Sequence, residues 1–528
     1  MSTPTDVSFS KWRSFLWPIQ GKEIKKFLPL LLIYALICLN YSVLKAAKDA
    51  LVITAPGSGA EAIPFIKVWV ILPMALLVTY LFTRLFNRYS QEKLFYIMIG
   101  SFLAFFMVFA LVLYPLRDIL HPHDTADKLQ AMLPQGFQGL ISIFRNWSYT
   151  LFYVMSELWG TAIMAVLFWG FTNEITSVGE AKRYYGILSV GANVAAIFSG
   201  HITIFLSMQA FDLSAIFGAD RWGQSLGLVT SVVVAAGLLT MGIFRWYNKR
   251  VINRDEALLK IQRDHTEKKK TMKLGMRKNF AYLAKSKYLI CIAILVVGFN
   301  VAINMIEIIW KDQIKELYPN PNDFNAYMGK VLIAIGWVST FVGLLLCSNL
   351  IRRLGWTFSA LITPVALLVT GVFFFGFILF KSNPALMGWT AAIGFTPLAL
   401  GVLFGTIQNV MSRACKYTLF DATKEIAFIP LNPESKLKGK AAIDGVGSRV
   451  GKSGGSIVHG GLLMMFGSVS LSAPYVGLIL LAVVIGWIGA TRSLGRQFNR
   501  LTSRHEELQI SDTEAAKTPE KKPLLETV

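Results

Sequence analysis

Apolar stretches long enough to cross a membrane recur along the whole chain. A helix of roughly 20 apolar residues spans the hydrocarbon core and satisfies its own backbone polar groups. The pattern predicts about twelve such helices, in equal numbers on either side of a charged segment at 248–287. Their expected ranges are 27–44, 63–86, 94–116, 145–174, 184–207, 224–246, 286–310, 330–350, 358–380, 386–412, 445–466 and 473–492. The stretch 137–175 exceeds one bilayer thickness, which predicts a bent or overlong helix, or a short surface helix that leads into a span.

Charged residues recur at matching places in the two halves of the chain. The repeated strings are Lys48-Asp49 with Lys67 and Lys311-Asp312 with Lys330, and also Glu180-Ala-Lys182 and Glu434-Ser-Lys436. A charge inside hydrocarbon costs at least ~2.5–3.5 kcal/mol, so repeated charges predict a water-filled site that prefers anions. Repeats in a six-plus-six arrangement are typical of transporters. The sequence therefore predicts an all-α polytopic membrane protein with two six-helix bundles, of the major-facilitator type.

Composition agrees with this fold class. Hydrophobic residues make up 54% of the chain and charged residues 16%, whereas a soluble chain carries roughly 25% charged residues. The net charge of +21 comes from 52 basic and 31 acidic residues, and the basic runs fall in alternate connections, as the positive-inside rule requires. Both termini are therefore expected in the cytoplasm, and no nucleic-acid partner is expected. The four cysteines lack metal-ligand spacing, so no metal or cofactor is expected.

These features divide the chain into five parts. We expect a cytoplasmic N-terminal segment at 1–26, a first six-helix bundle at 27–247, a cytoplasmic linker at 248–285, a second bundle at 286–497 and a cytoplasmic tail at 498–528. The tail is polar after Arg500 and is expected to lack fixed structure.

Lys67 lies about one turn inside an apolar span and recurs in the second half as Lys330. This recurrence favours a ligand-facing role over snorkelling, in which a lysine near a helix end lifts its ammonium group to the membrane surface. Lys45 and Lys48 precede this span, and for them both interpretations stay open.

A second candidate group contains Arg145, Tyr149 and Glu157. The spacing predicts Arg145 and Tyr149 on one helix face, with Glu157 two turns further along. A guanidinium beside an aromatic ring suits a planar base above a phosphate, and an Arg–Glu pair that closes the bundle is the alternative. Glu157 is the stronger signal, because the rest of its span is uncharged.

Asn300, Asn304, Glu307 and Lys311 recur at i+4, i+3 and i+4, which places them on one polar stripe of an apolar helix. The stripe predicts an inward-facing binding surface. A hydrogen-bond seam between helices is the alternative.

The Gly-rich segment at 436–455 contains Gly451-Lys452-Ser453, as in a phosphate-binding loop. A Walker motif is excluded, because Val446 stands where its first glycine is required and no strand precedes it. We expect a closely packed span with Arg449 and Lys452 projecting into the cavity. Without a Walker pair or a soluble catalytic domain, the protein is not expected to be an enzyme.

Several strings resemble the nucleotide transporter (ATP/ADP translocase) family of plastids and obligate intracellular bacteria. They include Lys48-Asp-Ala-Leu-Val-Ile-Thr-Ala55, Ser156-Glu-Leu-Trp-Gly160, Phe168-Trp-Gly-Phe-Thr-Asn-Glu-Ile175, Lys416-Tyr-Thr-Leu-Phe-Asp421 and Lys438-Gly-Lys-Ala-Ala-Ile-Asp444. The resemblance implies that the family's functional intramembrane charges correspond to Lys67, Glu157 and Glu307, with a further lysine among Lys416, Lys440 and Lys452. A transit peptide is missing, which points to a bacterial member in the inner membrane.

The resemblance also implies counter-exchange of ATP for ADP by alternating access, which would let an energy parasite import host ATP. The transported partners are then ATP and ADP, with phosphate as a third candidate, and we expect a monomer in the lipid bilayer. A proton-coupled symporter for nucleotides or other organic anions is the alternative, with Glu157 or Glu307 as the proton carrier. A membrane scaffold without transport would leave the polar stripe of Asn300 to Lys311 unexplained.

Overall fold

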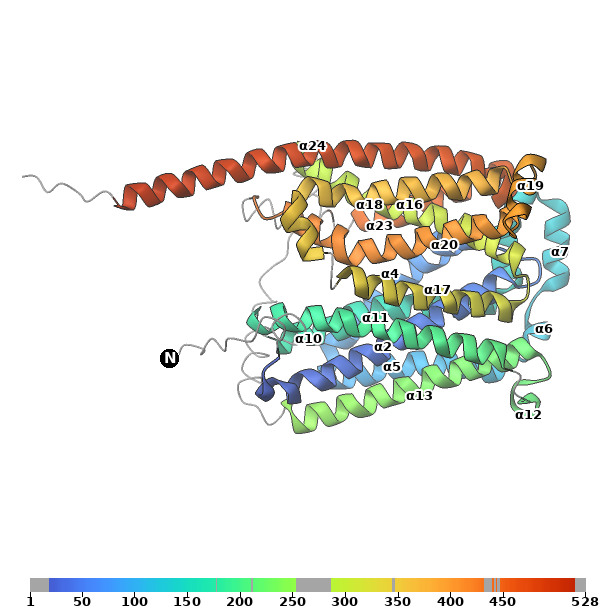
Figure 1. The fold of residues 1–528 in the computed structure, drawn as a ribbon. Coiled ribbons are helices and arrows are strands. Elements are labelled where there is room, and N and C mark those ends of the chain that lie inside the picture. Colours follow the sequence, from blue (N-terminus) through green and yellow to red (C-terminus); the bar gives the residue numbers. More distant parts are fainter. Residues whose placement is uncertain are drawn as a thin grey trace, which may run out of the picture.

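The computed structural model describes residues 19–176, 178–209, 212–252, 286–343, 347–431, 439–440, 443 and 447–517. Every regular element within these ranges is a helix, and the long helices run side by side (Figure 1). The predicted all-α fold is confirmed.

Six long helical segments form the first half of the chain. They are α2 (Ile24–Ile53), α3 with η2 and α4 (Ala62–Phe65, Ile66–Ile71 and Leu72–Arg88), α5 with η3 (Gln91–Val108 and Phe109–Leu113), α9 with η5 and α10 (Trp147–Leu158, Trp159–Phe168 and Trp169–Ile175), α11 (Val178–Met208) and α13 (Arg221–Arg250). The shorter elements are η1 (Gly21–Glu23), α6 (Arg117–Leu120), α7 (His123–Met132), η4 (Gln135–Phe137), α8 (Gln138–Arg145) and α12 (Ser214–Phe217). The segments η2, η3 and η5 are π-helical.

The second half has an equivalent set. Its long segments are α16 (Lys287–Leu317), α17 (Pro321–Phe341), α18 (Cys347–Leu379), α20 with η8 and α21 (Pro397–Cys415, Lys416–Phe420 and Asp421–Ala427), α23 (Ser448–Phe466) and α24 (Val469–Lys517). A short helix, α19 (Pro384–Ala392), precedes α20. Helix α18 is kinked at Gly355, whose φ of 78° is a left-handed conformation that glycine adopts without strain.

Nine of the described segments are long and apolar enough to cross a membrane, and the bent pair formed by α19 with α20 and α21 brings the number to ten. Two further helices, α17 with 21 residues and α23 with 19, lie beside them. Both carry buried polar side chains that lower their apolar character, such as Asn325 in α17 and His459 in α23. The protein is therefore a polytopic helical membrane protein.

The eighth span differs from its prediction. It was expected at 330–350, but α17 extends from Pro321 to Phe341. Asn320 caps its first turn by accepting a hydrogen bond from the backbone N–H of Asn322 at 2.9 Å, and proline is favoured at the first helical position. These local signals start the helix upstream of its apolar part.

The predicted tail also differs in part. Helix α24 continues to Lys517, beyond Arg500, where the polar sequence was expected to lack fixed structure. Residues 253–285, most of the predicted linker, lie outside the described residues, and so do Glu434 and Lys436 of the second repeat.

The overlong stretch at 137–175 is a short helix that leads into a span. Helix α8 ends at Arg145, and Asn146 has φ −109° and ψ 48°, which interrupts the helix before α9 begins at Trp147. This was one of the predicted alternatives.

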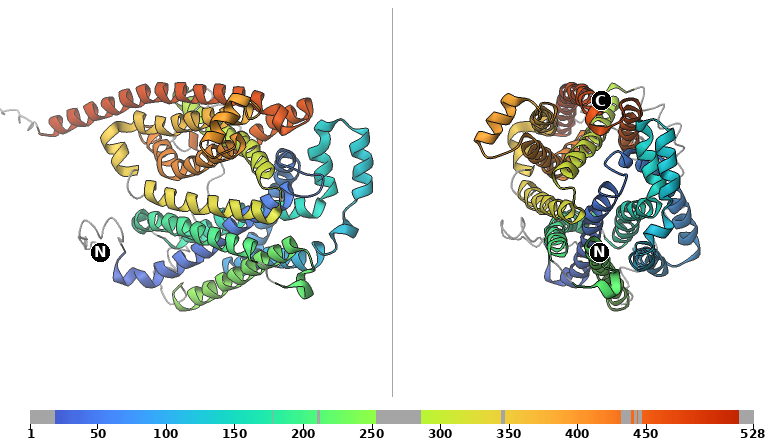
Figure 2. Two further views of the ribbon diagram at one scale, coloured as in Figure 1. Left: turned by 45° about the vertical axis from the view of Figure 1, so that its right-hand side comes forward. Right: turned by 90° about the vertical axis from the view of Figure 1, so that its right-hand side faces the viewer.

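The two halves pack against each other along α11 and α17 (Figure 1). Viewed along the helices, elements of the first half (blue to green) and of the second half (yellow to red) gather on different sides (Figure 2). The start of α2 and the end of α24 lie at the same end of the molecule, which we call the near end, and α7 and α19 lie at the opposite, far end (Figure 1). At the far end the halves also touch, because Lys315 Nζ donates a hydrogen bond to the Ser58 carbonyl oxygen at 2.5 Å.

Candidate functional site

A chain of alternating acidic and basic side chains crosses the centre of the molecule. In order, its members are Glu157, Lys48, Asp49, Lys311, Glu307 and Arg413, from helices α9, α2, α16 and α20. The successive N···O distances are 3.2, 3.2, 2.8, 3.0 and 3.1 Å. The pair between Asp49 and Lys311 joins the first half of the protein to the second.

The middle of this chain is shielded from solvent. Lys48, Asp49 and Lys311 are each at most 2% exposed. An isolated buried charge is very unfavourable, but each of these three groups has an opposite charge on both sides. Adjacent positions on α2 supply Lys48 and Asp49, and one helical turn separates Glu307 from Lys311 on α16.

An aromatic ring supports the first-half end of the chain. The Lys48 ammonium lies 3.6 Å from the centroid of the Tyr153 ring. A cation over an aromatic face is attracted by the ring's quadrupole. Tyr153 lies one turn before Glu157 on α9, so one helix supplies both contacts to Lys48.

Lys67 approaches the same region from the π-helical segment η2. Its ammonium group donates a hydrogen bond to Asn304 Oδ1. The Asn304 amide nitrogen in turn donates to the Lys452 carbonyl oxygen at 2.9 Å and to Ser456 Oγ at 2.7 Å. Asn304, a residue of α16, therefore links η2 of the first half to α23 of the second half. Single π-helical turns are frequent at functional sites.

The polar stripe of α16 divides into two parts. Asn300 donates to the carbonyl oxygen of Val296 on its own helix at 2.8 Å and packs against Gly451 of α23. Asn300 and Asn304 thus face α23, whereas Glu307 and Lys311 lie in the central ion-pair chain. Asn304 forms the predicted hydrogen-bond seam between helices, and the binding role of the stripe stays a prediction.

The formal charge of the site follows when the basic side chains near the ion-pair chain are counted with its members. Lys45 is within electrostatic range of Glu157, Glu307 and Arg413, and Lys67 is within range of Glu157 and Glu307. The five basic groups of this cluster, Lys45, Lys48, Lys67, Lys311 and Arg413, exceed its three carboxylates by two formal positive charges. A buried cluster with this excess favours a multivalent anion.

Arg145 and Tyr149 do not share one helix face, so that prediction is wrong. The break at Asn146 places Arg145 on α8 and Tyr149 on α9. Arg145 pairs with Asp127 at 2.5 Å, and the Tyr149 ring packs edge-on against His121 at 4.9 Å. Both residues lie toward the far end.

Lys330 does not match Lys67 in space. Its side chain is exposed on α17, although its place in the sequence repeat is equivalent. Arg449 and Lys452, which were predicted to project into the cavity, and the candidate lysines Lys416 and Lys440 lie toward the near end. Arg449 and Lys452 are exposed at the start of α23, Lys416 opens η8 directly after α20, and Lys440 pairs with Glu425 at 2.5 Å.

Sequence reasoning missed two members of the central group. Arg413 was placed just beyond the predicted end of a span at 412, where a basic residue ordinarily marks the membrane surface. Tyr153 lies one turn beyond Tyr149 on α9, and its ring meets the Lys48 ammonium group, whereas the Tyr149 ring packs against His121. Asp49 was recognised in the repeat but was not assigned to the site.

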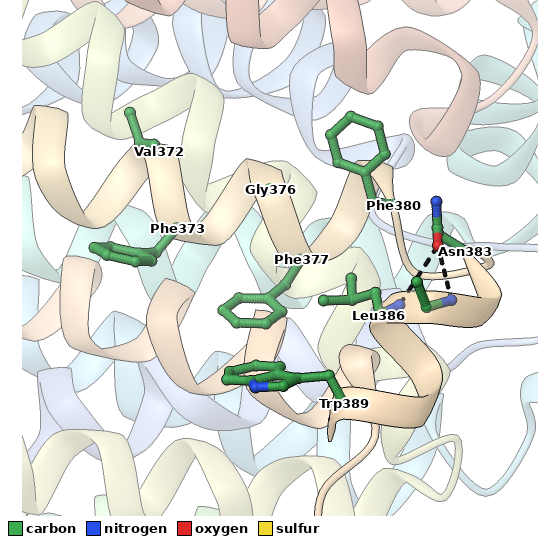
Figure 3. A pocket seen from close by; sticks show the side chains of 9 residues that line it. Val372, Phe373, Gly376, Phe377, Phe380, Asn383, Leu386 and Trp389 are labelled. Carbon is green, nitrogen blue, oxygen red and sulfur yellow. Dashed lines mark hydrogen bonds between the residues drawn. The ribbon is translucent and has the colours of Figure 1, made fainter. Parts of the chain in front are cut away.

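An apolar pocket lies away from these charges, between the end of α18 and α19 (Figure 3). Phe377 and Trp389 stack there with ring centroids 6.4 Å apart. Asn383 caps α19 by accepting hydrogen bonds from the backbone N–H groups of Ala385 and Leu386 (Figure 3). An apolar pocket whose polar group is already engaged does not suit a charged ligand.

Comparisons with known proteins agree with the site. Residues 2–498 match the family described as TLC ATP/ADP transporter. The ADP,ATP carrier protein 1 of Chlamydia muridarum (strain MoPn / Nigg) is 43% identical over 528 residues, which covers 100% of this chain and 98% of that one. The chloroplastic ADP,ATP carrier protein 2 of Arabidopsis thaliana is 41% identical over 505 residues, 96% of this chain and 80% of that one. A solved bacterial homologue of the iron transporter ferroportin, in an inward-facing state, aligns with 89% of this chain and 100% of its own at a TM-score of 0.49 and 13% identity. On the family match and these identities, the chain belongs to the TLC ATP/ADP transporter family.

Proposed function

We propose that this protein exchanges ATP for ADP across a membrane by alternating access between its two bundles. The observation that carries the proposal is the buried ion-pair chain that joins the halves through Asp49 and Lys311 and has an excess of positive charge. A polyphosphate is the multivalent anion that such a cluster can neutralise. The family membership and the names of the relatives are consistent with this substrate.

Phosphate groups would be held by Lys67, Lys311 and Arg413. Arginine forms paired hydrogen bonds to phosphate, and lysine acts as a point charge. In the empty site, Glu157 and Glu307 neutralise part of the positive charge, and bound phosphates would replace them as partners of Lys48 and Arg413. The cost of buried charge then stays small in both states.

Obligatory exchange follows from the same electrostatics. An empty site with uncompensated positive charge resists enclosure, because enclosure removes water from those charges. Either ATP or ADP supplies the missing negative charge and lets the bundles move around the site. A ligand shifts such an equilibrium only through its different affinity for the two states.

We further propose that the site opens toward the near end. There α4 has no buried residues, and Arg449 and Lys452 are exposed at the start of α23. With Lys416 and Lys440 they form a basic entrance that attracts nucleotides. The far end is held by the contact between Lys315 and Ser58.

The biological setting belongs to the same proposal. We place the protein in a bacterial inner membrane, as a monomer with both termini in the cytoplasm, where it imports host ATP and exports ADP by secondary active transport. Relatives in Chlamydia support the bacterial setting. Phosphate is a candidate third substrate.

The test is uptake of labelled ATP into proteoliposomes, with ADP either loaded inside or omitted. We expect uptake that requires internal ADP and persists when an uncoupler is added. Uptake that ignores internal nucleotide but collapses with the uncoupler would replace this proposal with a proton-coupled symporter, in which Glu157 or Glu307 carries the proton.

A further inference from the structure

A small pocket between α16 and α20 adjoins the second-half end of the ion-pair chain. Its lining residues are Ile303, Ile306, Gln408, Asn409, Ser412 and Arg413. Arg413 takes part in both the ion-pair chain and the pocket, because its guanidinium contacts Glu307 and also forms a wall of the pocket. A ligand whose phosphate is held at Arg413 can therefore extend into the pocket.

Gln408 presents an acceptor without a partner. The residue is 1% exposed, and its amide nitrogen donates a long hydrogen bond of 3.5 Å to the Leu367 carbonyl oxygen. Its Oε1 atom has no hydrogen-bond partner within the described part of the chain. Buried polar atoms are nearly always paired, so an unpaired acceptor in the wall of a pocket indicates a ligand that donates a hydrogen bond there.

Asn409, the next residue on α20, presents a donor. Its Oδ1 atom accepts a hydrogen bond from Arg413 Nε at 2.8 Å, which fixes the orientation of both side chains. An asparagine amide has two N–H donors on its nitrogen, and its oxygen is already engaged here. The amide nitrogen is thus the group that Asn409 can offer to a ligand.

Apart from Ser412, whose hydroxyl donates a hydrogen bond to the Gln408 backbone carbonyl oxygen at 2.6 Å, the remaining walls are apolar. Ile303 and Ile306 contribute only hydrocarbon, and Ile306 is 3% exposed. A ligand that fits this environment has apolar flat faces, a donor and an acceptor side by side on its edge, and a link to phosphate. Adenine has this pattern, with an exocyclic amine next to ring nitrogens, and glutamine and asparagine side chains read that edge in nucleic acids.

We propose that this pocket receives the adenine ring of the transported nucleotide, with Gln408 Oε1 accepting from the exocyclic amine and Asn409 Nδ2 donating to a ring nitrogen. The assignment rests on the proposed function and adds to it the basis of base selection. The pocket is small while Arg413 contacts Glu307. When phosphate draws the guanidinium away from Glu307, the wall that it forms moves and the pocket widens.

The same contacts reject guanine. Guanine carries a carbonyl oxygen where adenine carries its amine, and this oxygen would face the Gln408 acceptor. Two acceptors in a buried pocket repel each other and leave both unpaired. The site therefore discriminates through an unfavourable contact with the wrong base as well as a favourable contact with the right one.

The experiment measures the ratio of ATP to GTP uptake, as kcat/KM, in proteoliposomes loaded with ADP. Replacing Gln408→Leu removes the acceptor, and we expect the ratio to fall by about tenfold, as for the loss of one base-reading contact. Gln408→Glu keeps an acceptor but loses the bond to Leu367, and we expect it to retain the preference for ATP. The matched control is Gln313→Leu, which makes the same change at an amide that is also 1% exposed but lies outside the pocket.

An unchanged ratio in the Gln408→Leu protein, or an equal fall in the Gln313→Leu protein, overturns the adenine assignment and leaves ATP/ADP exchange standing. If Gln408→Leu abolishes uptake, thermal stabilisation of the purified variant by tripolyphosphate and by ATP decides the question. We expect tripolyphosphate to stabilise it as it does the wild type and ATP to stabilise it less, and equal loss of both effects counts against the pocket. A wild-type protein that transports no nucleotide overturns the proposed function, and this assignment falls with it.

Discussion

Asp49 on α2 and Lys311 on α16 form an ion pair of 2.8 Å at the centre of the protein, with neither residue more than 1% exposed. The pair joins two halves that also meet along α11 and α17, through Lys67 and Asn304, and at the far end. Each partner has a second opposite charge on its own helix, Lys48 for Asp49 and Glu307 for Lys311. Separation of the halves at this point therefore leaves each charge with one remaining partner.

This relationship predicts non-additive effects of mutation. Asp49→Asn and Lys311→Met should each destabilise the protein, because each leaves a buried charge with one partner in place of two; the effect should stay below the ~3–5 kcal/mol that loss of a sole partner costs. The double variant should be more stable than either single variant, because it removes both charges. Thermal unfolding of the four purified proteins in detergent measures the coupling, and destabilisation in the double variant equal to the sum of the two single effects would contradict it.

Glu307 is predicted to separate binding from transport. Glu307→Gln leaves Lys311 and Arg413 without their shared carboxylate, so the site gains positive charge. Nucleotide should bind more tightly in the ground state and be released more slowly, so that KM and kcat both fall while insertion in the membrane is unchanged. The control is Glu316→Gln, which removes a carboxylate from a half-exposed pair with Lys381 and should leave both constants near the wild-type values. A raised KM in the Glu307→Gln protein would argue against a role in neutralising the empty site.

Lys67 is predicted to be needed for uptake but not for assembly. Its ammonium group contacts Asn304, which is also held by α23, so Lys67→Ala removes the charge but leaves the hydrogen bond between Asn304 and α23 in place. Loss of one charged hydrogen bond to phosphate should lower kcat/KM by at least ~10-fold. Lys67→Arg should recover part of the activity. Wild-type uptake by the Lys67→Ala protein at equal membrane abundance would remove this residue from the site.

The sequence could predict those parts of the fold and site that depend on local pattern. Apolar length located most spans, and the i+4, i+3, i+4 spacing placed Glu307 and Lys311 on one face of α16. Arg413 was missed because a basic residue at a span end has an ordinary explanation at the membrane surface. Arg145 and Tyr149 were wrongly placed on one helix face because the break at Asn146 depends on tertiary packing, for which the residues themselves carry no strong signal. The equivalent place in the repeat also did not predict the surroundings of Lys330, whose side chain is exposed on α17.

The seam between α11 and α17 is predicted to require small residues. A Cβ atom at Gly200 would lie 2.5 Å from the Gly329 carbonyl oxygen, which is backbone and cannot move aside cheaply. Gly200→Ala should therefore push the halves apart, lowering thermal stability by about 1–3 kcal/mol and reducing uptake. Gly186 lies on the same helix, and a Cβ atom there would have no other atom within 4 Å. Gly186→Ala should therefore be neutral or slightly stabilising. Equal effects of the two substitutions would show that helix propensity, not close packing, decides the outcome.

Protonation of His121 in acid is predicted to weaken its contact with Ser148 at the far end of the first half. His121 lies between α6 and α7, outside the membrane-spanning segments. Burial disfavours its charged form, and with the nearby His123 it lowers the pKa of His121 to about 4. Its Nε2 atom lies 2.7 Å from Ser148 Oγ, at the start of α9.

The unfolded chain has the ordinary histidine pKa of about 6.5. It therefore binds a proton that the native state does not, and stability falls as the pH drops from about 6.5 toward 4. Thermal unfolding between these pH values should show a smaller decrease for His121→Gln than for the wild type. His201→Gln, at an exposed position on α11, should keep the wild-type slope. Identical pH dependence in all three proteins would show that proton uptake elsewhere controls acid stability.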